Sequence, residues 1–230
     1  MIIPGYDIDQ VQTEQFDHYI GLLIEWNKKF NLTAITDPEE IIIKHFADSL
    51  SISNLFDLTQ YHSVIDIGTG AGFPGIPLKI CYPNLKLTLL DSLNKRIEFL
   101  NYVISELGLS DVECIHGRAE ELGHNDCYRE KYDLCVSRAV ANLSSLSELC
   151  IPFVKVGGYF VSYKGDKAKE EYQNAENAIT LLGCSLDKSY QYDLIMKEQI
   201  GSRTLLSYIK NVSTDDKYPR RAGIPVKRPL

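Results

Sequence analysis

The feature that most constrains the fold of this chain is a glycine-rich loop that directly follows a short apolar run. Residues 64–67 read Val-Ile-Asp-Ile, and the next five residues are Gly-Thr-Gly-Ala-Gly. A short apolar run bounded by glycine predicts a buried strand that ends in a tight turn, where a ligand can approach the backbone closely. From Ser63 onward, similar apolar runs alternate with segments of helical spacing. This alternation is typical of an α/β fold, in which helices cover both faces of a parallel sheet.

The same patterns predict where the later strands and helices lie. Apolar runs predict further strands at residues 85–90, 112–115, 132–137, 159–163, 189–195 and 204–209. Helical spacing predicts helices at residues 94–107, 144–154 and 167–182. No helix separates the last two strands, so we expect one of them to run antiparallel as part of a hairpin. The sequence therefore predicts a Rossmann-like, doubly wound and mostly parallel sheet of about seven strands.

Helical spacing dominates the first sixty residues. Apolar side chains recur at intervals of three and four over residues 14–30, which predicts an amphipathic helix. A second helix should begin at Asp37 and Pro38, which suit the cap and the first helical position, and continue through Ile41–Leu55. We therefore divide the chain into an N-terminal helical extension, 1–60, and a sheet domain, 61–230, whose last part, 211–230, is a basic tail.

The charge of the chain is unevenly distributed. The formal net charge is −7, which argues against a protein that binds nucleic acid nonspecifically, because phosphates attract lysine and arginine. Residues 217–230, however, hold five basic side chains and no acidic one, so this segment carries +5 and the rest of the chain carries −12. An RNA substrate therefore remains possible, and its recognition would depend on a preformed RNA or ribonucleoprotein shape.

The compartment follows from what the chain lacks. The N-terminus has no basic start followed by a long apolar run, which argues against a secretory signal, and no run of 18 apolar residues predicts a membrane span. The six cysteines are scattered without a Cys-x-x-Cys pair, which is typical of reduced thiols in the cytosol rather than of disulfides or a metal site. We expect a cytoplasmic protein that uses no metal. The sequence fixes no oligomeric state.

The residues around the glycine loop indicate which ligand it binds. In a doubly wound sheet the ligand lies at the carboxyl ends of the strands. The glycines Gly68, Gly70 and Gly72 would let the backbone approach this ligand, and Asp91, at the end of the second strand, can accept the ribose hydroxyls of an adenosine.

Two further residues argue against a dinucleotide. Phe73 stands where the dinucleotide fingerprint requires its third glycine, and no Walker lysine follows the loop. Asp66, just before the loop, would repel a pyrophosphate but suits the ammonium of a methionine moiety. The pattern looks like the S-adenosylmethionine site of class I methyltransferases. An ordinary tight turn between strand and helix is the alternative.

The segment after the fourth strand narrows the class of methyl acceptor. Methylation of an exocyclic amine commonly uses an Asn/Asp-Pro-Pro-aromatic sequence there, whereas this chain has Ser-Arg-Ala-Val at residues 137–140. Methylation of a pyrimidine C5 needs an accessible thiolate, and neither Cys135, within a strand, nor Cys150, within a helix, is expected to be exposed. An acceptor that already offers a lone pair, such as guanine N7, needs only alignment with the methyl donor.

Several motifs together carry a resemblance over nearly the whole chain. In order they are Asn-Leu-Thr at 31–33, His-Phe-Ala-Asp-Ser-Leu at 45–50, the glycine loop with Phe-Pro-Gly at 73–75, Ser-Arg-Ala at 137–139 and Lys-Tyr-Pro-Arg-Arg at 217–221. The chain resembles the ribosomal RNA small subunit methyltransferase G family, also called glucose-inhibited division protein B. The resemblance implies N7-methylation of the guanine at nucleotide 527, in the 530 loop of bacterial 16S rRNA, with S-adenosylmethionine as cofactor. The partner would be 16S rRNA, the small ribosomal subunit or an assembly intermediate.

The resemblance also implies cofactor contacts, which are Gly68, Phe73, Ala119, Glu120 and Arg138. No catalytic residue is certain, and Arg138, His45 and Asp48 are candidates for positioning the acceptor. His45 and Asp48 lie three apart on one helical face, so they could equally form a capping or core hydrogen bond. Arg138 could instead be a surface ion-pair partner.

Five polar residues are candidates for contact with RNA, namely Asn31, Lys164, Arg203, Arg220 and Arg221. Asn31 equally fits a helix terminus, and Lys164 equally fits a lysine whose stem covers apolar surface. We expect Arg203 to begin the last strand. Like Lys164, it could contact RNA or instead cover apolar surface with its stem. Two other functions remain open: a methyltransferase for a small molecule or a protein, and a nucleotide-binding module or NAD-dependent oxidoreductase on the same fold. Binding of S-adenosylmethionine but not NAD would distinguish a methyltransferase from a nucleotide-binding module or an NAD-dependent oxidoreductase.

Overall fold

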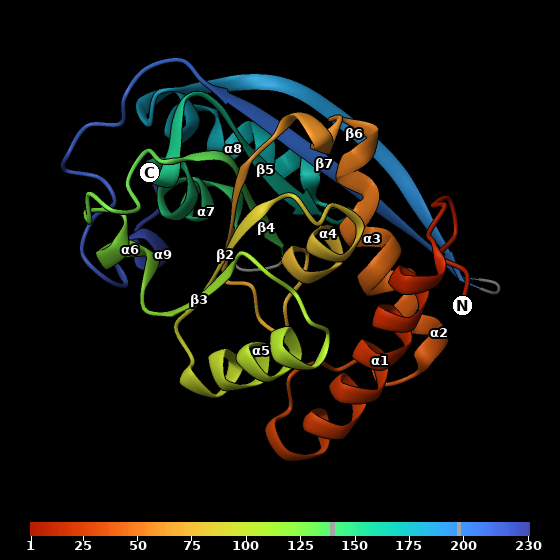
Figure 1. Ribbon diagram of the computed structural model, residues 1–230. Coiled ribbons are helices and arrows are strands. Elements are labelled where there is room, and N and C mark those ends of the chain that lie inside the picture. Colours follow the sequence, from red (N-terminus) through yellow and green to blue (C-terminus); the bar gives the residue numbers. More distant parts are fainter. Residues whose placement is uncertain (139–140, 197–198) are drawn as a thin grey trace.

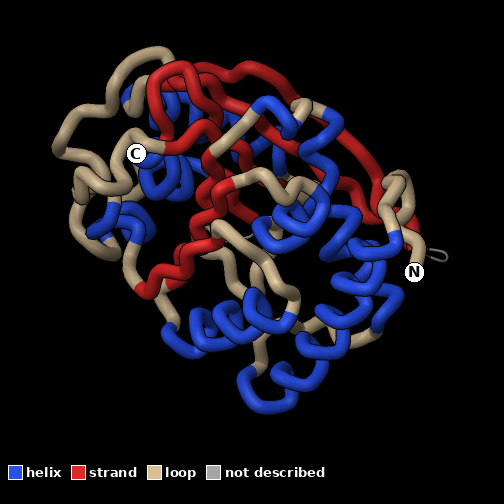
Figure 2. Tube along the Cα trace, in the orientation of Figure 1, coloured by secondary structure: helices blue, strands red, loops and turns tan. Residues whose placement is uncertain are grey.

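The computed structural model describes residues 1–138, 141–196 and 199–230. These residues form one twisted sheet of seven strands with helices on both faces (Figures 1 and 2). Its strand order is β3-β2-β1-β4-β5-β7-β6. The strands are β1 (Ser63–Ile67), β2 (Lys86–Asp91), β3 (Val112–His116), β4 (Tyr132–Arg138), β5 (Val154–Lys164), β6 (Cys184–Met196) and β7 (Gln199–Lys210).

The pairing of the strands follows the expected doubly wound topology. Strands β1 to β5 are parallel to one another, and β7 runs antiparallel to both β5 and β6. The predicted hairpin is therefore confirmed. The strand order reverses between β1 and β4, and the carboxyl ends of these two central strands are where a ligand is expected to bind.

The helices form a layer on each face of the sheet (Figure 1). One layer contains α1 (Gln10–Phe30), α4 (Gly75–Cys81) and α5 (Asn94–Glu106), and the other contains α7 (Leu143–Cys150) and α8 (Ala168–Leu181). The short helical segments are α2 (Pro38–Ile41), η1 (Ile42–Ala47), α3 (Asp48–Leu50), η2 (Ser51–Asn54), η3 (Leu58–Gln60), α6 (Ala119–Leu122), η4 (Ile151–Phe153) and α9 (Ile224–Lys227). Among the described residues, no helix is long and apolar enough to cross a membrane.

The helix predicted through Ile41–Leu55 is less regular than its apolar spacing suggested. Asp37 caps its start by accepting a hydrogen bond from the Glu40 N–H, as expected. The backbone then widens into a π-helical segment over η1 before it continues as α3 and the 3₁₀ turn η2. A π-helical turn shifts side chains around the helix axis and is frequent at functional sites. Here it carries His45, one of the predicted positioning residues.

Two other details of the sequence prediction were wrong. The helix expected over 144–154 ends at Cys150, because Pro152 has no N–H to continue the helical hydrogen bonds, and β5 already begins at Val154. Arg203 does not open the last strand, because β7 begins at Gln199. The hairpin strands extend beyond the apolar runs because pairing with a neighbouring strand satisfies the backbone of the polar residues too.

The N-terminal extension shares a hydrophobic core with the sheet domain. Phe16 and Tyr19 of α1 and Phe46 of η1 are completely buried in the same cluster as the β1 and β2 side chains. The Tyr19 ring also stacks on Phe73 at 5.5 Å between centroids. Residue 60 therefore marks where helical sequence gives way to the sheet, and a division of the chain there into separate folding units stays a prediction.

Candidate functional site

The glycine loop is held at the carboxyl ends of β1 and β2. The N–H groups of Gly68 and Thr69 donate to the Leu90 carbonyl at 2.8 and 3.2 Å, and Gly68, Gly70 and Gly72 all have positive φ. A Cβ added to Gly72 would lie 2.6 Å from the Tyr19 hydroxyl oxygen, so this glycine is required for packing against α1. A Cβ on Gly70 would meet only the Gly68 oxygen, at 4.0 Å. The backbone at Gly70 is therefore open to a ligand.

A cavity of about 430 Å³ lies over this loop, and we call it the loop cavity. Five predicted cofactor residues line it, namely Gly68, Gly70, Phe73, Asp91 and Arg138. Gly72 is not among the residues that line the cavity and packs against Tyr19 instead. Ala119 and Glu120 follow β3 at the same edge of the sheet but are not among the described residues that line the cavity. Glu120 instead accepts a hydrogen bond from the Gly223 N–H at 2.8 Å, so a cofactor contact at these two positions stays a prediction.

Asp91 shapes the loop and keeps capacity for a ligand. Its Oδ2 accepts from the Gly70 N–H at 2.9 Å and from an Arg96 guanidinium nitrogen at 3.0 Å. Its Oδ1 accepts from the Leu93 N–H at 2.9 Å. A carboxylate oxygen can accept two hydrogen bonds, so Oδ1 can take one more, as a ribose hydroxyl would require.

Asp66 lies below the loop and does not reach the loop cavity. It is fully buried, and its Oδ2 accepts from the Thr69 hydroxyl at 2.7 Å and from the Gly75 N–H at 2.9 Å. Its Oδ1 has no hydrogen-bond partner among the described residues. Burial raises the pKa of Asp66 from 3.8 to about 7, although the Thr69 and Gly75 hydrogen bonds oppose this. Asp66 is not among the described residues that line the loop cavity, so its expected contact with an ammonium group stays a prediction.

The raised pKa of Asp66 predicts a dependence of stability on pH. Between an unfolded pKa of about 3.9 and the folded value, the folded protein binds more protons, so the free energy of unfolding falls as pH rises, by up to about 1.4 kcal/mol per pH unit. Asp66→Asn keeps an oxygen for Gly75 and cannot ionise. We expect urea denaturation to show that the variant gains stability relative to the parent between pH 4.5 and 7. Parallel stability curves for the two proteins would contradict the assignment.

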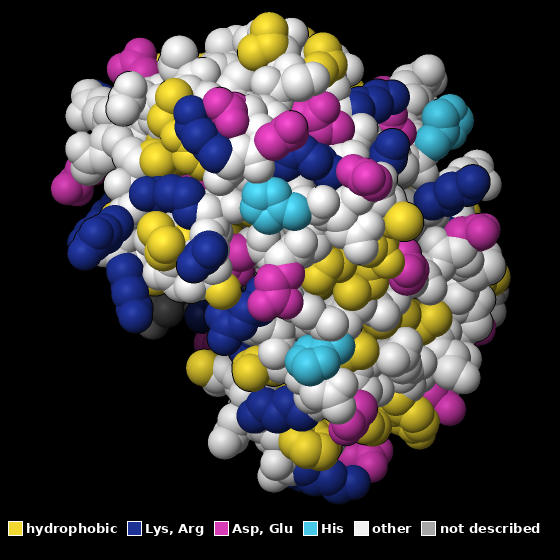
Figure 3. All heavy atoms as spheres, turned by 90° about the vertical axis from the view of Figure 1, so that its left-hand side faces the viewer, with side chains coloured by type: hydrophobic (Ala, Val, Ile, Leu, Met, Phe, Trp, Pro, Cys, Tyr) yellow, Lys and Arg dark blue, Asp and Glu magenta, His cyan; other side chains and the backbone are white. Residues whose placement is uncertain are grey.

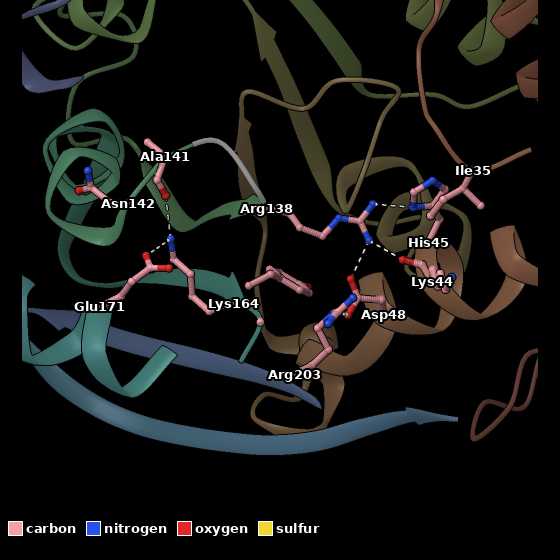
Figure 4. A pocket seen from close by; sticks show the side chains of 12 residues that line it. Ile35, Lys44, His45, Asp48, Arg138, Ala141, Asn142, Lys164, Glu171 and Arg203 are labelled. Atoms are coloured by element: carbon pink, nitrogen blue, oxygen red, sulfur yellow. Dashed lines mark hydrogen bonds and ion pairs between the residues drawn. The ribbon is translucent and has the colours of Figure 1, made fainter. Parts of the chain in front are cut away.

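A second cavity, of about 690 Å³, adjoins the first, and we call it the outer cavity (Figure 4). His45 and Arg138 line both cavities. The charged side chains of the outer cavity are four cations and two carboxylates, namely Lys44, Arg138, Lys164, Arg203, Asp48 and Glu171. Its excess of positive charge suits a polyanionic ligand.

Arg138 connects the extension to the sheet at the junction of the two cavities. One terminal nitrogen donates to Asp48 Oδ2 at 2.7 Å and to the Lys44 carbonyl at 3.1 Å, and the other lies 3.1 Å from His45 Nδ1 (Figure 4). The guanidinium also lies 5.2 Å from the centre of the Phe73 ring. Since Asp48 is only 2% exposed, this ion pair is largely desolvated.

His45 is neutral in this arrangement. A guanidinium can only donate, so His45 Nδ1 must accept, and the ring proton lies on Nε2. Burial, with the positive charge of Arg138 as the second cause, lowers the pKa of His45 to about 3. The ring stacks on Phe73 at 4.4 Å between centroids. Arg138 joins His45 to Asp48, and the positioning roles expected for these three residues stay predictions.

The predicted RNA-contacting residues lie in different environments. Lys164 is almost buried, and its ammonium lies 2.8 Å from both Glu171 Oε2 and the Ala141 carbonyl. Arg203 faces the outer cavity, with Nε 3.8 Å from Asp48 Oδ1. Asn31 is exposed and ends α1 in the left-handed conformation, and it lines neither cavity. The tail residue Arg220 pairs with Glu148, whereas Arg221 is exposed.

Several site residues were not found from the sequence. Tyr192 donates its hydroxyl to Asp48 Oδ1 at 2.7 Å, and Lys44, Tyr163 and Glu171 line the outer cavity. They come from elements far apart in the chain, so no spacing signals them. Thr33 lines the loop cavity, and the only sequence signal for it is its place in the Asn-Leu-Thr motif.

The residues present fit the cofactor predicted for this fold. The loop cavity has the size of a small-molecule site, the backbone at Gly70 is open, and Asp91 and Arg138 offer an acceptor and a cation. Cys135 and Cys150 are both fully buried, as expected, so neither offers a nucleophilic thiolate. Among the described residues, no group of three or more His, Cys, Asp or Glu side chains could hold a metal ion.

Solved structures show the same fold. The structure titled TYW2 from M. jannaschii in complex with AdoMet has a TM-score of 0.54 at 12% identity, covering 91% of this chain and 80% of that one. A putative sarcosine dimethylglycine methyltransferase from Galdieria sulphuraria has a TM-score of 0.57 at 11% identity, covering 86% and 98%. These similarities identify the fold as that of class I methyltransferases.

Sequence comparison identifies the family. The family model described as rRNA small subunit methyltransferase G matches residues 12–195. The ribosomal RNA small subunit methyltransferase G of Alkaliphilus metalliredigens is 53% identical over 226 residues, which are 98% of this chain and 94% of that protein. The protein of the same name from Brevibacillus brevis is 50% identical with the same coverage. This chain therefore belongs to the rRNA small subunit methyltransferase G family.

Proposed function

We propose that this protein transfers a methyl group from S-adenosylmethionine to N7 of a guanine in bacterial 16S rRNA, at nucleotide 527 of the 530 loop. Membership of the family makes the chain an rRNA methyltransferase with S-adenosylmethionine as its cofactor. The observation that carries the finer proposal is the pair of adjoining cavities with His45 and Arg138 as their common wall. One cavity would hold the cofactor and the other the acceptor base.

The hydrogen bonds of His45 and Asp48 favour a methyl acceptor that needs no side chain to remove a proton. His45 Nδ1 is occupied by Arg138, so it cannot take a proton from an acceptor. Asp48 holds this wall together, because its Oδ2 pairs with Arg138 and its Oδ1 accepts from the Tyr192 hydroxyl. Guanine N7 offers a lone pair and loses no proton on methylation. S-adenosylmethionine would supply an electrophilic methyl group, and the residues of this chain would mainly orient the base and exclude water.

The charge of the outer cavity supports a nucleic-acid acceptor. Lys44 and Arg203 lie at its wall, where they can attract the phosphates next to the target base. The acidic remainder of the surface would limit binding to a substrate of suitable shape. The substrate is then 16S rRNA in the small subunit or in an assembly intermediate, and the cytoplasmic location expected from the sequence stays a prediction.

The position of methylation can be tested directly. Small subunits from a strain that lacks the gene are incubated with purified protein and S-adenosylmethionine, and the 16S rRNA is cleaved with borohydride and aniline at N7-methylguanosine. Primer extension should then stop next to nucleotide 527 only when the protein is present. Methyl incorporation without this stop would reject the N7 assignment and leave the rRNA methyltransferase activity intact. Subunits from the parent strain provide the control, because their target should already be methylated.

A further inference from the structure

Thr33 brings the N-terminal extension to the wall of the loop cavity. It lies in the connection between α1 and α2, beside Leu32, and both line the cavity together with the glycine loop. Its backbone is fixed by Asn27, whose side chain accepts from the Thr33 N–H and donates to the Thr33 carbonyl, both at 2.9 Å. The position of Thr33 relative to the cavity is therefore set by α1.

The Thr33 hydroxyl accepts two hydrogen bonds. Its Oγ1 lies 3.0 Å from His45 Nε2, and since Nδ1 of the same ring accepts from Arg138, Nε2 carries the proton and donates. The Ile35 N–H also donates to this Oγ1, at 3.1 Å. A hydroxyl oxygen has two lone pairs, so both are used.

The Thr33 hydroxyl therefore keeps its own proton, which it can donate to a third group. Among the described residues, the Thr33 hydroxyl makes these two hydrogen bonds and donates to neither partner. The open side of Thr33 is the loop cavity, whose wall also contains the cationic Arg138. A hydroxyl donor in a cavity whose wall carries a cation favours an anionic acceptor, and the anionic group of S-adenosylmethionine is its methionine carboxylate.

We propose that the Thr33 hydroxyl donates a hydrogen bond to the carboxylate of bound S-adenosylmethionine, which makes Thr33 a cofactor-binding residue of the N-terminal extension. The chain Arg138–His45–Thr33 orients this hydroxyl, since each donor in it fixes the next acceptor. The proposal depends on the cofactor and not on the acceptor base, so it does not depend on the N7 assignment.

The test measures cofactor affinity by calorimetry, without RNA. Thr33→Val removes the hydroxyl and keeps the shape, and its dissociation constant for S-adenosylmethionine should rise about tenfold or more, as for a hydrogen bond to a charged group. Decarboxylated S-adenosylmethionine lacks the acceptor, so its dissociation constant should hardly differ between the variant and the parent. Thr33→Ser should bind both ligands like the parent. Thr13→Val is the matched control, because the Thr13 hydroxyl donates to the carbonyl of Asp9, the N-cap of α1.

Two calorimetric results would overturn the proposal. Unchanged affinity of Thr33→Val for S-adenosylmethionine would show that the hydroxyl makes no contact with the cofactor. An equal loss for both ligands would show that Thr33 acts elsewhere, on the adenosine or on the fold. A measurement on the parent protein does not depend on the folding of any variant. Nitrogen-15 NMR should show His45 protonated at Nε2 at pH 7, and a proton on Nδ1 would refute the hydrogen-bond chain.

Discussion

Replacing Arg138 by methionine is expected to abolish methyl transfer and to lower the free energy of unfolding by about 3–5 kcal/mol, because the buried Asp48 carboxylate loses its guanidinium partner at 2.7 Å and is left with Arg203 at 3.8 Å. The same change removes the group that lines both cavities and fixes His45. Activity is measured as incorporation of labelled methyl groups into small subunits, and stability by urea denaturation. Arg138→Lys should be a poor substitute, since one ammonium cannot reproduce the contacts of the two guanidinium nitrogens.

A second substitution separates the two effects of Arg138. Asp48→Asn in the Arg138→Met background removes the buried charge that has lost its guanidinium partner, so most of the lost stability should return while methyl transfer stays absent. Recovery of activity in this double variant would show that Arg138 only neutralises Asp48. An Arg138→Met protein as stable as the parent would contradict the buried ion pair itself.

Replacing Arg220 by alanine should destabilise the protein by about 3–5 kcal/mol, whereas replacing its neighbour Arg221 should change stability by less than about 0.5 kcal/mol. Glu148 is completely buried in α7, and it accepts from the Arg220 backbone at 2.7 Å and from its guanidinium at 2.6 to 3.1 Å. Arg221, in the tail, is exposed. Figure 3 shows lysine and arginine side chains gathered along one side of the face that carries α6 and α9.

The same pair of variants tests the role of the tail in RNA binding. Arg221→Ala should keep its thermal midpoint but bind small subunits more weakly, with a binding constant that depends less steeply on salt. Arg220→Ala should differ from Arg221→Ala in thermal denaturation, because its midpoint should be lower than that of the parent. If Arg221→Ala left both affinity and salt dependence unchanged, the predicted RNA contact at this position would be wrong. Equal stability of the two variants would contradict the Glu148 pair.

The parts of the fold that were predicted correctly depend on neighbouring residues. Asp37 caps its helix through a backbone N–H three residues away, and the run Val64–Ile67 forms a strand because its side chains are apolar. The hairpin of β6 and β7 followed from the absence of a helix between two apolar runs. The doubly wound, mostly parallel topology also followed, since strands that alternate with helices are joined by right-handed crossovers.

The sequence predicted only those parts of the site that belong to a motif of neighbouring residues. The glycine loop and Asp91 meet because strand ends of a parallel sheet share an edge, and this much could be expected from the sequence. The irregular backbone at His45 could not be expected, because a π-helical turn has the same apolar spacing as a helix over so few residues. The basic tail appeared uniform in sequence, and its folding against α7 gives Arg220 and Arg221 different surroundings.

The sequence by itself determined the α/β topology, the position of the glycine loop and the family of this protein, because these depend on periodicity and on motifs of adjacent residues. Only the tertiary structure decided which charges are paired and which hydroxyls are free to bind a ligand. Asp48 and Arg138 are 90 residues apart in sequence, as Arg220 and Glu148 are 72. Burial makes such pairs strong, and burial is a property of the packed chain.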